Sequence, residues 1–202
     1  MNRRGIIILS VLILFPAVWR MTDHPWNFAP VGALALFCGT YFRRKSWGLF
    51  VPLAAMVLSD VAMGWQKGDW NYAFHQTQPV VYACFALYAC IGFGLRSFWS
   101  RSTQSNEPGG NRRASWQTKA VSVPCGALCG AIAFFLITNL AVWWVFYAHT
   151  WVEFVACYNL AMPYFRTTLQ GDLFFVVVFF GAYELVRGQL PALQTTKFLY
   201  AD

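Results

Sequence analysis

The chain has 202 residues, of which 58% are hydrophobic and only 11% are charged, and its formal net charge is +7. Soluble domains carry roughly 25% charged residues, so this composition excludes an ordinary water-soluble domain and indicates a membrane protein. The positive charge does not point to a nucleic-acid partner, because the sequence contains no nucleic-acid recognition motif.

Six apolar stretches follow one another along the chain, and each is close to the length of a membrane-spanning helix. Crossing about 30 Å of hydrocarbon takes about 20 predominantly apolar residues, with about 17 as a lower limit. We therefore expect an all-α, polytopic integral membrane bundle with six transmembrane helices in a single domain. The expected helices cover residues 5–19, 26–42, 47–65, 79–98, 120–147 and 171–186.

The connections between these helices predict an orientation. Residues 100–119 (SRSTQSNEPGGNRRASWQTK) are too polar to bury a core and are expected to form a flexible linker. Twelve of the 15 Lys and Arg residues lie at the N-terminus, around 43–45, over 96–119 and in the C-terminal tail. Short basic connections stay in the cytoplasm. We therefore expect a multi-pass protein of the bacterial plasma (inner) membrane, with the linker and both termini cytoplasmic.

Polar residues within or beside the apolar stretches are candidate ligand contacts. A charge at the bilayer centre costs about 2.5–3.5 kcal/mol, and aromatic and polar side chains alternate in the outer loops, as they do in walls of small-molecule sites. As an alternative, Asp60 or Asp172 pairs with Arg166 and only fastens helices together. The predicted ligand-binding residues are Asn27, Asp60, His75, Tyr82, Asn139, Tyr158, Asn159, Arg166 and Asp172.

The six cysteines predict no metal site and no cofactor. They form no C-x-x-C motif and have no His at ligand spacing, and small residues of this kind are common at helix contacts. Cys84 and Cys157 lie near the outer side, so a role as ligands to a bound cofactor stays open for these two.

Several blocks of the sequence carry a family resemblance: NFAPVGALALFCGTYF, VPLAAMVLSD, FFLITNLAVW and CYNLAMPYFRTTLQGDLFF. They resemble a family of small bacterial integral membrane proteins of unknown function. That family in turn looks like the S components, the substrate-capturing subunits, of energy-coupling-factor vitamin transporters. The resemblance covers most of the chain apart from the first helix, the linker and the tail. It implies six helices, an external site closed by outer loops, and release through a partner transmembrane subunit with ATPases.

A stripe of small residues runs along the second expected helix. At about 100° per residue, Ala29, Gly32, Ala35 and Gly39 share one face, and small residues let another helix approach closely. The neighbour can be another helix of the same bundle. The resemblance to S components favours a docking face for the transmembrane partner instead, and this is the prediction.

Three functions are compatible with the sequence. The leading hypothesis is a substrate-binding membrane subunit for uptake of a small nutrient, such as a vitamin or its precursor. The alternative is a structural or assembly protein without a ligand. An enzyme using His75, His149, Asp60 or Glu153 is the least favoured, because no catalytic motif supports it. No Walker motif is present, so ATP hydrolysis must come from a partner.

Overall fold

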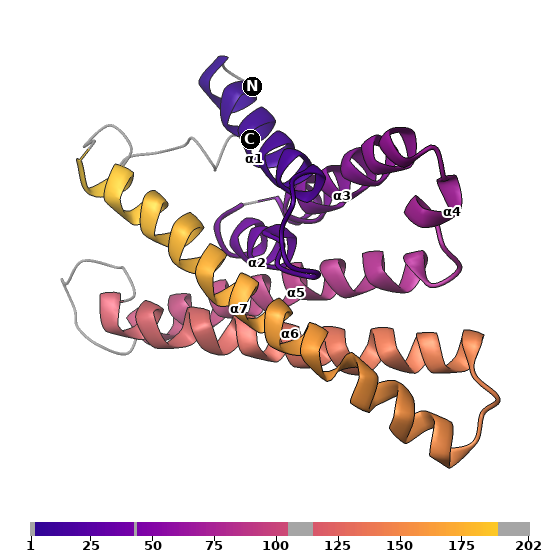
Figure 1. Ribbon diagram of the computed structural model, residues 1–202. Coiled ribbons are helices and arrows are strands. Elements are labelled where there is room, and N and C mark those ends of the chain that lie inside the picture. Colours follow the sequence, from indigo (N-terminus) through magenta and orange to yellow (C-terminus); the bar gives the residue numbers. More distant parts are fainter. Residues whose placement is uncertain (1–2, 43, 105–114, 190–202) are drawn as a thin grey trace.

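The computed structural model describes residues 3–42, 44–104 and 115–189 and shows a bundle of helices in these ranges (Figure 1). The expectation of an all-α fold with six main helices is confirmed, and a one-turn helix, α4, is added to it. The helices are α1 (Arg3–Met21), α2 (Val31–Tyr41), α3 (Lys45–Lys67), α4 (Trp70–Ala73), α5 (Gln78–Gln104), α6 (Trp116–Phe146) and α7 (Trp151–Gln189).

Four of these helices are long and apolar enough to cross a membrane: α3, α5, α6 and α7. The two others, α1 and α2, are apolar but shorter within the described residues. The length and composition of these helices therefore indicate a membrane protein. The centre of the expected linker, residues 105–114, lies outside the described residues, while its two ends belong to α5 and α6.

Helix α2 forms the centre of the bundle, and all eleven of its residues are buried. It packs against α3, α5, α6 and α7, and Figure 1 shows α7 crossing in front of it. The expected start at Trp26 is wrong, because the helix begins only after Pro30. Pro25 and Pro30 interrupt this region, and Asn27 adopts a positive φ of 65°. At 1.5 Å per residue α2 is about 16 Å long, roughly half the hydrocarbon thickness.

Glycines allow α2 and α5 to approach closely along the C-terminal half of α2. A Cβ on Gly39 would collide with the backbone carbonyl of Ala89, and one on Gly92 would collide with that of Leu36. Lipid offers no hydrophobic drive for helix association, so this backbone contact is a main source of packing between the two helices. The C-terminal half of α2 therefore lies in direct contact with the α5 backbone.

Helix α7 corrects the largest error in the expected elements. The outer loop predicted over 148–170 is helical from Trp151, and α7 continues without a break through Pro163 to Gln189. Its 39 residues give a length of about 58 Å, and Figure 1 shows α6 and α7 reaching beyond the other helices as a hairpin. At the opposite end, Glu184 accepts hydrogen bonds from Lys119 (2.7 Å) and from the Tyr41 hydroxyl (2.8 Å), which ties α7 to α6 and α2.

Candidate ligand-binding cavity

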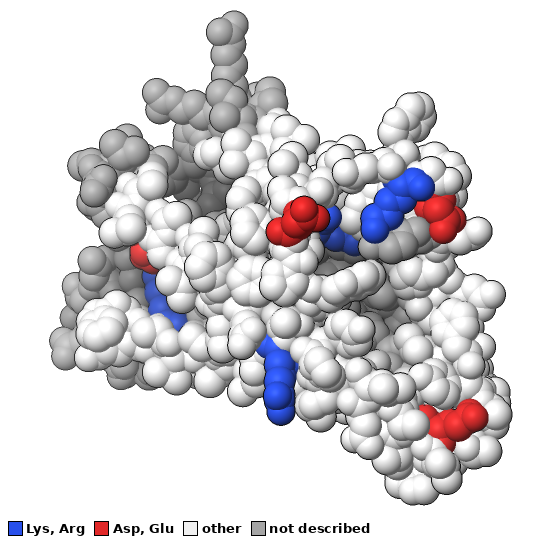
Figure 2. Space-filling view, in the orientation of Figure 1, with Lys and Arg blue, Asp and Glu red and all other residues white. Residues whose placement is uncertain are grey.

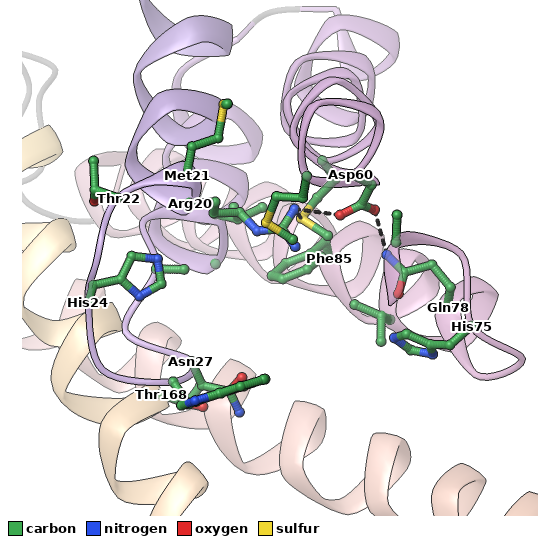
Figure 3. A pocket seen from close by; sticks show the side chains of 18 of the residues that line it. Arg20, Met21, Thr22, His24, Asn27, Asp60, His75, Gln78, Phe85 and Thr168 are labelled. Atoms are coloured by element: carbon green, nitrogen blue, oxygen red, sulfur yellow. Dashed lines mark hydrogen bonds and ion pairs between the residues drawn. The ribbon is translucent and has the colours of Figure 1, made fainter. Parts of the chain in front are cut away.

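A cavity of about 920 Å³ lies at the end of the bundle where the segment between α1 and α2 meets α3, α4 and α5. Figure 2 shows that this face carries few charged side chains and is hollowed between the part built from α3 and α4 and the part built from α6 and α7. In Figure 3, His24 and Asn27 stand on one side of the cavity, with Gln78 and His75 on the other. Phe134 of α6 and Thr168 of α7 complete the wall.

Asp60 forms the first of two buried carboxylate sites in this cavity. It is 1% exposed and lies on α3. Arg20 Nη1 donates to Asp60 Oδ1 at 2.7 Å and also to Ser59 Oγ. The Tyr82 hydroxyl donates to Asp60 Oδ2 at 2.6 Å, and the Gln78 amide donates to the same oxygen. One cation and two neutral donors thus surround this carboxylate and join α1, α3 and α5.

Asp172 forms the second site, and its surroundings are different. It is 2% exposed, lies on α7 and borders the cavity. Among the described residues its one hydrogen bond comes from the Tyr88 hydroxyl of α5. Gly32 of α2 lies directly against the carboxylate, and Gly130 of α6 leaves room for the Tyr88 ring. Four helices therefore meet around a single tyrosine–aspartate pair.

The segment over residues 22–30 borders the cavity without being helical. Trp19 Nε1 donates to the Phe28 carbonyl oxygen at 3.0 Å and holds the segment against α1. The His24 ring stacks on Trp19 with ring centroids 6.2 Å apart. Its Nδ1 lies 3.0 Å from the Pro25 carbonyl oxygen, while its Nε2 is buried and has no hydrogen-bond partner among the described residues. Irregular backbone at membrane depth is tolerated where it lines a cavity.

Four of the nine predicted ligand residues line this cavity: Asn27, Asp60, His75 and Asp172. Tyr82 reaches it indirectly, through its hydrogen bond to Asp60. These residues come from five different parts of the chain, so the structure brings together positions that the sequence analysis grouped only by their expected side of the membrane. Their role in binding a ligand stays a prediction.

The other four predicted residues lie elsewhere. Asn139 Nδ2 and the Tyr158 hydroxyl donate to the backbone carbonyls of Phe135 and Leu136, each at 2.7 Å. Asn159 and Arg166 are exposed and outside the cavity wall. The reason is that α7 is one continuous helix: six residues separate Arg166 from Asp172, which places them about 120° apart around its axis. Among the described residues neither aspartate pairs with Arg166, so the alternative in which Arg166 fastens the helices is wrong.

Three important side chains were not predicted. Arg20 is one of only three basic residues outside the basic connections, and that isolation was a usable signal. Gln78 lies at the end of the polar loop QKGDWNYAFHQTQ, where nothing distinguishes it from its neighbours. Tyr88 belongs to an apolar run in which a tyrosine is ordinary. Only the fold shows that these three contact the two buried aspartates.

The small-residue stripe that was predicted to dock a partner packs against helices of this chain. Gly32, Ala35 and Gly39 are buried inside the bundle, and Ala29 is half-buried. Gly32 packs against Asp172 and Tyr88, and Gly39 packs against the backbone of α5. The stripe allows close packing, as expected, but the helices that use it belong to this chain. Its three buried residues offer no surface to another protein.

The two cysteines that stayed open as cofactor ligands are both buried. Cys157 donates a hydrogen bond to the Asn139 carbonyl oxygen at 3.6 Å, and Cys84 is outside the cavity wall. In the part of the chain that the structure describes, no three His, Cys, Asp or Glu side chains are grouped as metal ligands are.

The model of the family of unknown function DUF6580 matches residues 1–193. No curated protein and no solved structure matches the chain.

Proposed function

The chain belongs to the family of unknown function DUF6580, and we propose that it is a substrate-binding membrane subunit that captures a small polar nutrient in the cavity described above. The observation that carries the proposal is the burial of Asp172 in the cavity wall with only one hydrogen-bond donor among the described residues. A buried carboxylate is costly within a membrane and commonly marks a functional site.

The size and lining of the cavity support a small-molecule ligand. Its volume of about 920 Å³ lies within the 300–1,000 Å³ that is usual for such sites. Phe85 and Phe134 provide an apolar wall with ring centroids 5.4 Å apart. Asn27, Gln78 and Thr168 place polar groups around the same space. An apolar wall with a few polar side chains is typical of a site that orients one compact molecule.

Uptake is the role that fits this site if the cavity faces outwards. The basic connections favour a cytoplasmic position for the opposite end of the bundle. Both termini then lie on the cytoplasmic side of the bacterial plasma membrane. The chain has no Walker motif, so we propose an energising partner, a transmembrane coupling subunit with ATPases, as in the energy-coupling-factor transporters whose S components it resembles.

Metabolites retained by the purified protein test this function. We expect native mass spectrometry of the full chain, purified in mild detergent, to show a small molecule bound at one copy per protein. A protein that retains no small molecule, and is not stabilised by a bacterial metabolite extract, would favour the structural or assembly role instead.

Cysteine accessibility tests the orientation separately. In a background without the six native cysteines, Thr150→Cys in the α6–α7 turn should react with a membrane-impermeant maleimide in intact cells. Ser46→Cys near the start of α3 should react only after the cells are opened. The reverse pattern would contradict an outward-facing cavity.

A further inference from the structure

The charged lining of the cavity is not balanced. Three aspartates line it, Asp23, Asp60 and Asp172, against one arginine and one lysine, Arg20 and Lys67. Arg20 contacts Asp60 directly in an ion pair of 2.7 Å. The negative charge of Asp60 is therefore already neutralised within the protein.

Asp172 has no such cation. Among the described residues it receives one hydrogen bond, from the neutral Tyr88 hydroxyl, and forms no ion pair. A carboxylate has two oxygens and about four acceptor sites, so most of its accepting capacity is unused. An isolated charge in a low-dielectric site is expensive unless the group takes up a proton or an opposite charge joins it. The cavity next to Asp172 is the space from which that charge can come.

A second buried acceptor in the cavity wall can take a hydrogen bond from a ligand. A carbonyl oxygen only accepts hydrogen bonds, so His24 Nδ1 must donate to the Pro25 carbonyl oxygen at 3.0 Å. In the neutral ring, Nε2 is then an acceptor. This nitrogen is buried without a partner among the described residues. Asp172 and His24 Nε2 can therefore both accept a hydrogen bond from a ligand.

The aromatic wall favours the same charge. Phe85 and Phe134 line the cavity, and so does Tyr88, whose ring centroid is 6.2 Å from that of Phe85. Aromatic faces attract cations and provide apolar surface for the rest of a compact molecule.

From these contacts we infer that the ligand of this cavity is a small organic cation, whose protonated nitrogen pairs with Asp172 and whose apolar or aromatic body packs on Phe85 and Phe134. This inference rests on the proposed function and adds the chemical class of its substrate. Asp60 keeps a different role, because Arg20 already occupies the position that a ligand cation would take.

Three fractions of a bacterial metabolite extract serve as probes: compounds retained on a cation exchanger, compounds retained on an anion exchanger, and compounds retained on neither. We expect only the cationic fraction to raise the melting temperature of the full-length protein in detergent. Mass spectrometry after gel filtration then identifies the retained compound, and titration calorimetry gives its Kd.

Substitution of the carboxylate tests the contact. Asp172→Asn keeps the shape of the side chain and an oxygen for the Tyr88 hydroxyl, but it removes the charge. The Kd of the identified cation should rise about 30-fold or more, as for a buried charge pair that loses one partner. Asp69→Asn is the matched control, because Asp69 caps α4 outside the cavity wall and asparagine caps equally well. Its Kd should equal that of the wild type.

Each other outcome overturns a defined part of the inference. Binding from only the anionic or neutral fraction refutes the cationic class and leaves the proposed function standing. Unchanged affinity in Asp172→Asn refutes the pairing with Asp172. If Asp172→Asn does not fold, the N-acetylated form of the identified compound is tested on the wild-type protein, and binding equal to that of the amine refutes the inference. Absence of binding from all three fractions removes the proposed function as well.

Discussion

Two buried aspartates border the same cavity, and the protein surrounds them with different hydrogen-bond donors. Asp60 is surrounded by Arg20, Gln78 and Tyr82, whereas Asp172 has only the Tyr88 hydroxyl among the described residues. The exposed fractions are nearly equal, 1% and 2%, so burial does not explain the difference. The difference lies in the donors that the fold supplies.

This comparison separates two uses of a buried charge. A carboxylate that the protein neutralises itself fastens helices together, and removing its partner leaves an uncompensated charge. A carboxylate left with spare acceptor sites beside a cavity is available to a ligand. Asp60 joins α1, α3 and α5 in the first way, and the position of Asp172 fits the second. The variants below test whether the two sites behave so differently.

The largest effect is expected from Arg20→Met, which leaves the Asp60 carboxylate buried without its cation. Breaking a buried ion pair on one side costs about 3–5 kcal/mol. We expect a correspondingly lower free energy of unfolding, measured by denaturation of the purified protein in detergent. The double variant Arg20→Met with Asp60→Leu removes both charges and should recover most of the loss. A single variant as stable as the wild type would refute the fastening role.

A matched pair of tyrosine substitutions compares the two sites directly. Tyr88→Phe removes the one donor that Asp172 has among the described residues and should lower the free energy of unfolding by about 1.5–3 kcal/mol, the value for hydrogen bonds to charged groups. Tyr82→Phe leaves Asp60 with Arg20 and Gln78, so its cost should be about 0.5–1.5 kcal/mol. Equal costs in the same denaturation assay would show that the two carboxylates are satisfied to the same degree.

Two glycines of α2 extend the comparison from the cavity to the close contact between α2 and α5. In Gly39→Ala the new methyl group meets the Ala89 backbone carbonyl, which cannot move aside, and overpacking of this kind costs about 1–3 kcal/mol. In Gly32→Ala it meets the side chains of Asp172 and Tyr88. These can shift, so we expect a smaller loss of stability together with weaker retention of the co-purified ligand.

Gly94→Ala provides the control for this pair, because nothing lies within 4 Å of its new Cβ. It should be neutral, or stabilising by up to about 1 kcal/mol through helix propensity. Ligand retention that falls equally in Gly32→Ala and Gly39→Ala would mean that the binding site is sensitive to general loosening of the bundle.

The sequence was sufficient for the class of fold but not for the exact helices. Apolar length and the basic connections predict a six-helix membrane bundle, and the structure has six main helices. The start of α2 was misplaced although Pro30 marked it, because apolar residues continue on both sides of the proline. Helix α7 was cut short because the polar residues of Y-F-R-T-T-L-x-G-D lowered the local hydropathy, which carries no information on backbone hydrogen bonding.

The sequence identified the buried aspartates of the site, but it did not identify the side chains that contact them. A charge in an apolar stretch is conspicuous, so Asp60 and Asp172 were found without a structure. Which cation approaches which carboxylate depends on how helices rotate and pack, and sequence spacing constrains this only within a single helix. Arg20 is 40 residues from Asp60, and no local pattern joins them. The small-residue stripe shows the same limit, since close packing is readable from sequence but the identity of the neighbour is not.

The smallest effect is expected from Arg166→Lys, and it tests the choice of site itself. A direct contact between Arg166 and the ligand would make its planar guanidinium essential, because lysine cannot reproduce that geometry. The structure places Arg166 on the exposed surface and outside the cavity wall, about 120° around α7 from Asp172. Surface substitutions of this kind change stability by no more than about 0.5 kcal/mol. We therefore expect unchanged stability and unchanged retention of the ligand, measured beside Asp172→Asn, and a loss of ligand in Arg166→Lys would show that binding occurs outside the cavity that Asp60 and Asp172 share.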